Sequence, residues 1–397
     1  MAIVGAGPAG LSAATELGRR GVHSVVVFDR DSAPGGVPRH CGHSPYGLRE
    51  FGRPMLGPAY AGALVTRARA AGVRIVPGAT VMGLTEGPRL RVSSDTGTAE
   101  VSARLVLLAT GIRETTRAGR LIGGTKPGGV LTTGGLQSMV YGAGMRPFLR
   151  PVILGTELVA FSAILTCRHA GIRPVAMIEP GTRVTARWPA HLLPRILGIE
   201  LMHRTTLVSI EGGDRVEEVV LGTRDGERRI AADGVIVTGG FRPEATLVRQ
   251  GGLAYDPATG GPEIDEFGRT SDPAIFAAGN LLRGVETAGW CWAEGRAVAA
   301  AMVRALAGVL PPPATGRVVR VGDDIAYVVP QRIAGGTDPA LDRLQLRATA
   351  ATRGRLSLRV NGQETAGRSL SALPERRLLL PLPAPTGAPS VSLEGLQ

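Results

Sequence analysis

The sequence predicts an α/β protein with two Rossmann-like domains of three-layer ββα architecture and a small C-terminal all-β segment. The order strand–turn–helix–strand occurs twice, at Ile3–Asp29 and again at Val152–Glu179. Hairpin-like alternation follows each repeat and ends in an apolar strand, at Leu105–Ala109 and at Gly234–Thr238. Beyond the Pro-rich stretch 310–313, short alternating segments separated by Gly, Asn-Gly or Pro replace this pattern. Two repeats and one β appendage therefore account for the chain.

Hydrophobic periodicity places the individual elements. In the first half we expect, in order, a strand at 2–4, a helix at about Ala9–Arg20, a strand at Ser24–Asp29, a helix at 60–72, a strand at Arg74–Val76, a hairpin at 89–108 and a Gly- and Thr-rich crossing between domains at 112–147. In the second half we expect a strand at Pro151–Leu154, a helix at about Leu158–Ala170, a strand at Pro174–Ile178, hairpins at 205–239 and a helix at about Thr287–Ala307. Residues 317–330, 343–349, 354–361 and 376–382 are expected strands, with a hairpin turn at Asn361-Gly362.

Composition narrows the class of protein. The 397 residues, 44% of them hydrophobic, are too many for one ordinary core. The net charge is +12, but the arginines are scattered without a basic run, which argues against a nucleic-acid partner. The cysteines Cys41, Cys167 and Cys291 lie far apart, so neither a dithiol nor a cysteine-only iron–sulfur site fits. No signal peptide and no membrane-length apolar stretch is found, so we expect a cytoplasmic protein that reaches the inner membrane only through partners.

The first repeat carries a dinucleotide-binding fingerprint. Gly5-Ala6-Gly7-Pro8-Ala9-Gly10 fits Gly-x-Gly-x-x-Gly directly after a strand and at the start of a helix. Gly5 permits the tight turn, Gly7 lets a pyrophosphate approach the backbone, and Gly10 lets the helix pack on the strand. Asp29 ends the second strand, where a carboxylate accepts hydrogen bonds from an adenosine ribose. A Gly-rich turn without a ligand is the alternative, and the strand, helix and acid around it argue against that.

Two later segments favour FAD over NAD. The apolar strand Leu105–Leu108 ends in the turn Ala109-Thr110-Gly111, and residues 270–280 end in Gly279-Asn280. With these motifs, residues 1–310 resemble the two-dinucleotide-binding-domain flavoproteins, the glutathione reductase and thioredoxin reductase superfamily. In that family the Ala-Thr-Gly turn lies beside the flavin, and a Gly-Asp near the end binds the ribityl and phosphate groups. Here Asn280 stands in place of the Asp.

The resemblance implies further flavin contacts. The turn Pro34-Gly35-Gly36 corresponds to a family turn that nears the flavin, and the helix that opens at Thr287-Ala288 would direct its amides at the flavin pyrimidine. The expected cofactor is FAD, with these predicted ligands: Gly5, Gly7, Pro8, Ala9, Gly10, Asp29, Arg30, Gly35, Gly36, Ala109, Thr110, Gly111, Gly279, Asn280, Thr287 and Ala288. The predicted FAD-binding domain is discontinuous, 1–115 with 240–310; 116–239 is an NAD(P)-binding-like domain, and 315–397 is a β-sandwich-like domain.

The second fingerprint is degenerate. It reads Gly155-Thr156-Glu157-Leu158-Val159-Ala160, so that a glutamate replaces the second glycine. Glu157 places a side chain and a negative charge where backbone must meet pyrophosphate, and close like charges cost about 1–4 kcal/mol even at moderate dielectric. We therefore expect no NAD(P)H in the usual pose. The alternative is that Glu157 turns outward on a reshaped loop, which Glu179 supports because it stands where a ribose ligand would be.

Two segments point to a branch of the family. Gly35–His43 and Gly129–Gln137 resemble the larger, NAD-fold flavin subunits of opine oxidase, hydrogen cyanide synthase and hydroxyproline or proline dehydrogenase complexes. The resemblance implies two partners, an iron–sulfur component and a second flavoprotein subunit. Several relatives carry a C-terminal cysteine cluster, whereas residues 315–397 contain no cysteine, so a separate small iron–sulfur protein would be needed.

Arg39, His40, Cys41 and His43 are the candidate catalytic residues. They follow the Gly35-Gly36 turn, in a stretch that passes the flavin face in disulfide reductases. Two histidines and an arginine can bind an anionic substrate and move protons near neutral pH. The alternative is a polar loop in which a histidine caps a carbonyl and the cysteine is a small buried side chain.

These observations predict an FAD-dependent dehydrogenase subunit. It would oxidise an amino acid, opine or similar small polar substrate and pass electrons to its partner subunits. Two alternatives stay open: an NAD(P)H-dependent flavin or disulfide-type reductase, and a non-catalytic FAD electron-relay or scaffold subunit.

Overall fold

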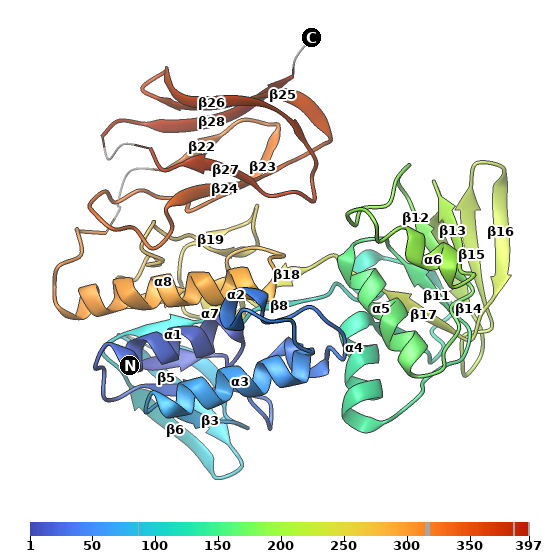
Figure 1. Ribbon diagram of the computed structural model, residues 1–397, viewed down its shortest axis with the longest axis horizontal. Coiled ribbons are helices and arrows are strands. Elements are labelled where there is room, and N and C mark those ends of the chain that lie inside the picture. Colours follow the sequence, from blue (N-terminus) through green and yellow to red (C-terminus); the bar gives the residue numbers. More distant parts are fainter. Residues whose placement is uncertain (86, 314–317, 384–385, 396–397) are drawn as a thin grey trace. The chain divides into compact units, whose positions relative to one another are not determined.

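The computed structural model describes residues 1–85, 87–313, 318–383 and 386–395. These residues form two compact units (Figure 1). Unit 1 contains 1–36, 61–112 and 243–397, and unit 2 contains 37–60 and 113–242. The predicted domain boundaries at 115 and 240 lie within three residues of the observed divisions at 112 and 242. Two assignments differ. Residues 37–60, assigned to the first domain by sequence, belong to unit 2, and the C-terminal β region, predicted as a domain of its own, is part of unit 1.

A five-stranded parallel sheet forms the centre of unit 1, in the order β21-β7-β1-β2-β3. Its strands are β21 (Ile275–Ala277), β7 (Val106–Leu108), β1 (Ala2–Val4), β2 (Val26–Phe28) and β3 (Arg74–Val76). Four of them are short runs of aliphatic or aromatic residues, as expected for parallel strands covered on both faces. Helices α1 (Pro8–Arg19) and α8 (Ala288–Leu306) pack against each other beside this sheet, and α3 (Gly57–Ala70) precedes β3.

Unit 2 contains a similar sheet that differs in one edge strand. Its parallel sheet runs β10-β17-β11-β12-β13, so four strands follow the order of β7-β1-β2-β3, but β10 comes first in the chain whereas β21 comes last. Its strands are β10 (Val130–Thr132), β17 (Gly234–Val237), β11 (Pro151–Leu154), β12 (Ala176–Glu179) and β13 (Glu200–His203). Its helices are α4 (Thr133–Gln137), α5 (Leu158–His169) and α6 (Leu192–Ile196), with α2 (Leu48–Phe51) in the segment 37–60. The prediction of two Rossmann-like repeats is confirmed.

Smaller sheets complete both α/β parts. In unit 1 a three-stranded sheet contains β4 (Thr80–Thr85), β5 (Arg89–Ser94) and β6 (Gly97–Ser102). In unit 2 a four-stranded sheet contains β9 (Gly123–Gly124), β14 (Thr206–Glu211), β15 (Glu218–Thr223) and β16 (Gly226–Ala231). The remaining short elements are β8 (Ile112–Arg113) paired with β18 (Arg242–Pro243), α7 (Thr246–Gln250), and β19 (Tyr255–Asp256) paired with β20 (Gly261–Pro262).

The C-terminal region is all-β, as expected. One sheet has the order β22-β28-β25-β26 and the other β23-β24-β27 (Figure 1). Their strands are β22 (Arg320–Val321), β23 (Ile325–Val329), β24 (Arg343–Ala348), β25 (Thr352–Val360), β26 (Gln363–Ala372), β27 (Leu378–Pro381) and β28 (Pro389–Gly395). Apolar residues of both sheets form one buried cluster, which is the arrangement of a β-sandwich. The predicted limits at 315–317 and 396–397 lie outside the described residues.

Two sequence expectations need correction. The Gly- and Thr-rich stretch 112–147 is not only a crossing, because it supplies β10 and α4 to the second sheet and its helical layer. Its turn-forming composition hid the strand Val130–Thr132, which is only three residues long. The stretch 89–108 is a hairpin, as expected, but β4 extends it to three strands.

Within the described residues, no helix combines the length and the apolar character that crossing a membrane requires.

Candidate functional site

The first fingerprint forms a tight strand–turn–helix in unit 1. Gly5 has a φ of +105°, and a Cβ on it would lie 2.4 Å from the carbonyl oxygen of Ala109. A Cβ on Gly10 would lie 1.9 Å from the carbonyl oxygen of Gly5, so this glycine permits the close packing of α1 on the turn. A Cβ on Gly7, in contrast, would meet nothing within 4 Å. Gly7 is therefore not needed for packing, and the space beside it is open.

The N-terminus of α1 suits an anion. Gly7 is the N-cap residue, with φ −81° and ψ −175°, and it offers no side chain to the first backbone amides. Pro8 opens the helix, and the first turn contains no acidic residue. Uncapped amides and the positive end of the helix dipole attract a phosphate group. These features fit the pyrophosphate of a dinucleotide.

Two further predicted segments lie against the fingerprint. A Cβ on Gly36 would lie 2.8 Å from the Cα of Gly7, and one on Gly279 would lie 2.7 Å from the Cβ of Ala9. The amide of Gly35 also donates to the carbonyl oxygen of Ala6 at 2.9 Å. The structure thus brings together segments that are more than 200 residues apart in sequence.

The remaining predicted ligands of unit 1 surround the same turn. Asp29 accepts hydrogen bonds from the amides of Ala6 at 2.5 Å and Asp31 at 2.9 Å, so its carboxylate joins β2 to the fingerprint. The hydroxyl of Thr110 donates to the carbonyl oxygen of Glu244 at 2.8 Å, which fixes the turn after β7. Arg30 is exposed to solvent beside Asp29.

Asn280 has a more local role than the resemblance implied. Its carboxamide accepts from the amide of Glu286 at 2.7 Å and donates to the carbonyl oxygen of Glu286 at 3.1 Å, which closes the loop 280–286. A carboxamide has two N–H donors, and this contact uses one of them. Helix α8 then begins after the N-cap Thr287, whose side chain makes no capping bond, and its first turn has no acid. The predicted contacts of Asn280, Thr287 and Ala288 with a flavin remain predictions.

The degenerate fingerprint of unit 2 keeps the backbone of the first. Gly155 has a φ of +117°, close to that of Gly5. Glu157 is the N-cap of α5 with φ −73° and ψ 169°, nearly the conformation of Gly7. The loop is therefore not reshaped, and the glutamate occupies the position at which the first site has open space.

The carboxylate of Glu157 lies across the carboxyl ends of β11 and β17. It accepts a hydrogen bond from the hydroxyl of Thr238 at 2.7 Å. A Cβ on Gly239 would lie 2.0 Å from Oε1 of Glu157, which shows how closely the side chain covers that turn. Burial raises the pKa of the Glu157 carboxyl, and the carboxylate of Glu114 acts in the same direction. A pyrophosphate at this turn would have to displace an acid that is already in place.

Two residues that the sequence did not indicate complete this turn. Glu114 accepts from the amides of Gly134 at 2.7 Å and Gly239 at 3.1 Å. Arg120 donates to the carbonyl oxygen of Thr238 and lowers the pKa of Glu157 by its charge. Glu114 and Arg120 belong to the stretch interpreted as a crossing, and no motif links them to Thr238, so this cluster had no signal in the sequence.

Glu179 corresponds to Asp29 of the first repeat. It accepts from the hydroxyl of Thr156 and, at 2.8 Å, from the amide of Gly181. The amide of Thr185 donates to the hydroxyl of Thr156 at 3.0 Å, and that of Ala186 donates to its carbonyl oxygen at 2.9 Å. Unit 2 thus keeps an acidic residue at the ribose-binding position of a nucleotide site. The segment 185–186 is hydrogen-bonded to Thr156, the residue that contacts this acid.

Arg39, His40, Cys41 and His43 all lie in unit 2. A hydrogen-bonded series connects two of them: the thiol of Cys41 contacts Gln137 at 3.5 Å, and Gln137 donates to Ser162 at 2.7 Å. Ser162 in turn lies 2.6 Å from Nε2 of His43. This series holds the segment 37–60 to α4 and α5, which explains why the segment belongs to unit 2.

Burial in this series of side chains determines the protonation states of Cys41 and His43. Burial raises the pKa of the Cys41 thiol and lowers the pKa of the His43 imidazole. Cys41 is therefore a thiol and His43 a neutral imidazole at pH 7. Arg39 and His40 contact each other, with Nη2 and Nε2 3.1 Å apart, and both are half-buried.

We expect the thiols of the native protein to resist modification. All three cysteines are buried, and burial raises the pKa of each thiol, for Cys167 and Cys291 to about 12. Because the thiolate is the reactive species, Ellman's reagent at pH 7 should find almost no thiol until denaturant is added, and then all three. Rapid labelling of Cys41 in the native protein would instead support a nucleophilic role. A Cys41→Ser variant identifies which thiol reacts.

The fold and the site define a flavoprotein with two dinucleotide-binding folds, one with an open phosphate turn and one with a turn filled by glutamate. The chain belongs to the pyridine nucleotide-disulphide oxidoreductase family, whose model matches residues 1–295. It is an FAD-dependent oxidoreductase, and the residues of unit 1 fit that cofactor. The family region ends before the C-terminal β region begins.

Three curated relatives show similarity over most of the chain. The ferredoxin reductase component of chlorobenzene dioxygenase from Cupriavidus is 29% identical over 70% of this chain. The HcnB component of hydrogen cyanide synthase from Pseudomonas aeruginosa is 30% identical over 72%, and an opine oxidase subunit from Rhizobium meliloti is 26% identical over 77%. The aligned part covers 66%, 67% and 70% of these relatives, so the chain spans about two thirds of their length.

Solved structures agree on the fold. Thioredoxin reductase from T. acidophilum matches with a TM-score of 0.65 and 21% identity, over 77% of this chain and 98% of that one. L-proline dehydrogenase from P. horikoshii matches with a TM-score of 0.58 and 20% identity, over 77% of this chain and 55% of that one. At these identities the likeness establishes the two-domain fold and no more.

Proposed function

We propose that the protein is the FAD-carrying subunit of a dehydrogenase that oxidises an amino acid, an opine or a similar small polar substrate. Oxidation removes a hydride and a proton from the substrate, and bound FAD would supply the acceptor for the hydride and its two electrons. The electrons then leave to partner subunits, for which we propose a second flavoprotein and a small iron–sulfur protein. One observation carries the proposal: Glu157 fills the phosphate turn of unit 2, so NAD(P)H is a poor electron donor or acceptor.

Two further observations support a role inside a complex. Two of the relatives are named as subunits, of hydrogen cyanide synthase and of opine oxidase. Unit 2 also exposes two large apolar side chains near its degenerate turn: Trp188 and Leu158 are 78% and 67% exposed. Trp188 and Leu158 each lie two residues from the hydrogen-bonded pair Ala186 and Thr156. Exposed apolar groups gathered in one region are typical of a surface that another protein covers.

Within this proposal, Arg39 and His40 are the residues for an anionic substrate. The guanidinium of Arg39 would bind a carboxylate, and the imidazole of His40 beside it would accept the proton. His43 and Cys41 instead hold the segment 37–60 through Ser162 and Gln137. The catalytic roles of all four residues are part of the proposal.

Stopped-flow measurement of the flavin absorbance tests the central point. Mixed with NADH or NADPH, the oxidised protein should bleach more slowly than about 1 per second, the lower end of ordinary enzyme turnover. Dithionite should bleach the same sample at once, which shows that its flavin is redox-competent. Rapid bleaching by either nucleotide would reject the proposal.

An NAD(P)H-dependent reductase is the second candidate. Glu179 holds the ribose-acid position and, like Asp29 in unit 1, accepts from the amide two residues further on; its second donor is the hydroxyl of Thr156, where Asp29 has the amide of Ala6. A nucleotide bound there would still need Glu157 to move away from Thr238. Tight binding of NADH to the wild-type protein together with single-turnover reduction would favour this candidate.

A further inference from the structure

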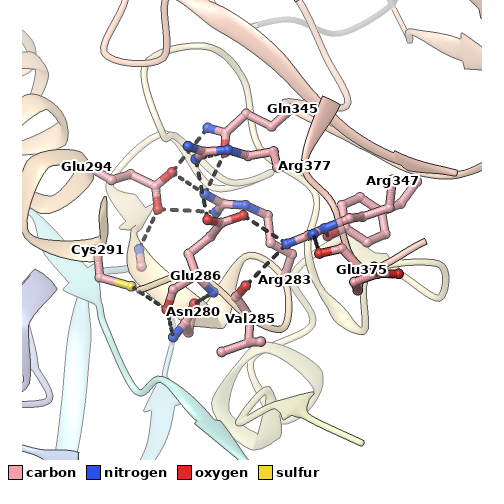
Figure 2. Close-up of polar contacts among 12 residues, drawn as sticks. Asn280, Arg283, Val285, Glu286, Cys291, Glu294, Gln345, Arg347, Glu375 and Arg377 are labelled. Atoms are coloured by element: carbon pink, nitrogen blue, oxygen red, sulfur yellow. Dashed lines mark hydrogen bonds and ion pairs between the residues drawn. The ribbon is translucent and has the colours of Figure 1, made fainter. Parts of the chain in front are cut away.

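The C-terminal β region contributes polar side chains to a buried cluster beside the predicted flavin ligands. Figure 2 shows Gln345, Arg347 and Arg377 reaching residues of the segment 279–294. That segment contains predicted FAD ligands and the start of α8, and it precedes the C-terminal sheets in sequence. All of these residues belong to unit 1.

One half of the cluster holds the backbone of Gly279. Arg283 pairs with Glu294 at 2.8 Å, and their side chains are only 2% and 7% exposed. The carboxylate of Glu294 accepts from the amide of Gly279 at 2.8 Å. Gln345 of β24 accepts from the guanidinium of Arg283 at 2.7 Å. The C-terminal region therefore supports, through two side chains, the residue that packs on Ala9 of the fingerprint.

The other half of the cluster holds Asn280. Arg347 and Arg377 lie 3.2 and 3.5 Å from the two carboxylate oxygens of Glu286, and all three side chains are at most 14% exposed. Arg347 also donates to the carbonyl oxygen of Val285 at 3.2 Å. The main chain of Glu286 makes both hydrogen bonds to the carboxamide of Asn280. Two arginines of the β region thus fix the loop that orients this carboxamide.

Arg377 also reaches the first turn of α8. Its guanidinium carbon lies 3.9 Å from the ring centre of Trp290, a cation–π distance. Trp290 is the third residue of the helix. The amides at this end of α8 are the ones that the family resemblance directs at the flavin. The same arginine therefore contacts both the loop before the helix and the helix itself.

Stability alone does not account for this cluster. Taking several charges out of water costs about as much as their attraction returns, so buried ion pairs contribute little net stability, and in some proteins their role is instead to select one geometry. The geometry favoured here is that of Gly279, Asn280 and the start of α8. The three side chains that impose it, those of Gln345, Arg347 and Arg377, all lie beyond residues 1–295, the region matched by the family.

We propose that the C-terminal β region is a working part of the FAD site, in which Arg347 and Arg377 are positioning residues for the loop 279–286 and the N-terminus of α8. The region does not merely follow the flavoprotein domains in sequence. Without its arginines the loop loses its fixed geometry and FAD is held less tightly. The proposal concerns cofactor binding, so it stands apart from the identity of the substrate and of the electron acceptor.

The test is FAD affinity in full-length variants. Flavin is removed from the wild type and from an Arg347→Met, Arg377→Met double variant, and rebinding of FAD is followed by quenching of its fluorescence. We expect the dissociation constant of the double variant to rise at least tenfold. The matched control is Arg355→Met with Arg359→Met, two arginines of the same region in exposed pairs with Glu364 and Glu394, and it should change the constant less than twofold.

Thermal unfolding of the apo-proteins separates positioning from simple stability. If the double variant melts at a lower temperature but binds FAD as tightly as the wild type, the cluster is only structural and the proposal is overturned. If the double variant does not fold, Arg377→Lys decides, because it keeps the charge next to Glu286 but loses the planar group on Trp290. That variant should weaken FAD binding at least threefold, and unchanged binding would overturn the proposal.

Discussion

A Gly7→Glu variant is expected to fold normally and to be purified without FAD. The new side chain meets no protein atom at its Cβ, since nothing lies within 4 Å of that position. The backbone at Gly7 has an ordinary extended conformation, and unit 2 accommodates a glutamate at the equivalent residue with nearly the same dihedral angles. The fold therefore tolerates the change, and we expect the substitution to lower the affinity for FAD and not the stability of the protein.

The loss of affinity should be large. A carboxylate about 4 Å from a phosphate charge costs about 4 kcal/mol at the effective dielectric of a protein surface. That energy corresponds to a nearly thousandfold weaker complex, and the volume of the side chain adds to it. We expect at least a hundredfold rise in the FAD dissociation constant, measured by fluorescence titration of apo-protein, with unchanged far-ultraviolet circular dichroism.

Two matched variants separate the contributions of side-chain volume, charge and backbone packing to the loss of FAD binding. Gly7→Ala adds volume without charge and should weaken FAD binding less than Gly7→Glu does. Gly10→Ala should instead damage the fold, because its Cβ would lie 1.9 Å from the carbonyl oxygen of Gly5. A yellow Gly7→Glu protein with full FAD content would show that the pyrophosphate does not lie at this turn.

The sequence predicted those features that depend on local patterns. The glycines of residues 5–10 are spaced by the geometry of one turn, so the open phosphate site could be inferred without a structure. The repeat of strand, helix and strand predicted two parallel sheets, which share the order of four of their five strands. In the C-terminal region, β26 was missed because most of its residues are polar or small and exposed, so that no apolar alternation marks it.

The contacts between segments that are distant in sequence could not be predicted from the sequence alone. The grouping of residues 37–60 with unit 2 depends on the pairs Cys41–Gln137 and His43–Ser162, which are 96 and 119 residues apart. The same applies to Glu286, whose partners Arg347 and Arg377 come from a separate β region. A single sequence shows residue types and spacings, but not which side chains the fold brings together.

Replacing Glu157 by glycine should create a nucleotide site in unit 2. The change restores the Gly-x-Gly spacing on a backbone that already has the required form, since Gly155 and residue 157 match Gly5 and Gly7 in conformation. It also removes a carboxylate that would cost about 1–4 kcal/mol beside a pyrophosphate. We expect NADH to bind the variant about fivefold to nearly a thousandfold more tightly than the wild type, by isothermal titration calorimetry.

The choice of nucleotide and a neutral variant make this prediction specific. Glu179 accepts bonds from Thr156 and Gly181 at the ribose end of the turn, and its carboxylate would repel the 2′-phosphate of NADPH, so NADH should bind the Glu157→Gly protein better than NADPH. Glu157→Gln keeps the volume of the side chain and removes its charge. If charge is the main obstacle, the glutamine variant gains most of the affinity; if volume is, only the glycine variant does. Should neither variant bind NADH more tightly than the wild type, Glu157 is not what closes unit 2 to nucleotides, and the electron route proposed for the enzyme loses its main support.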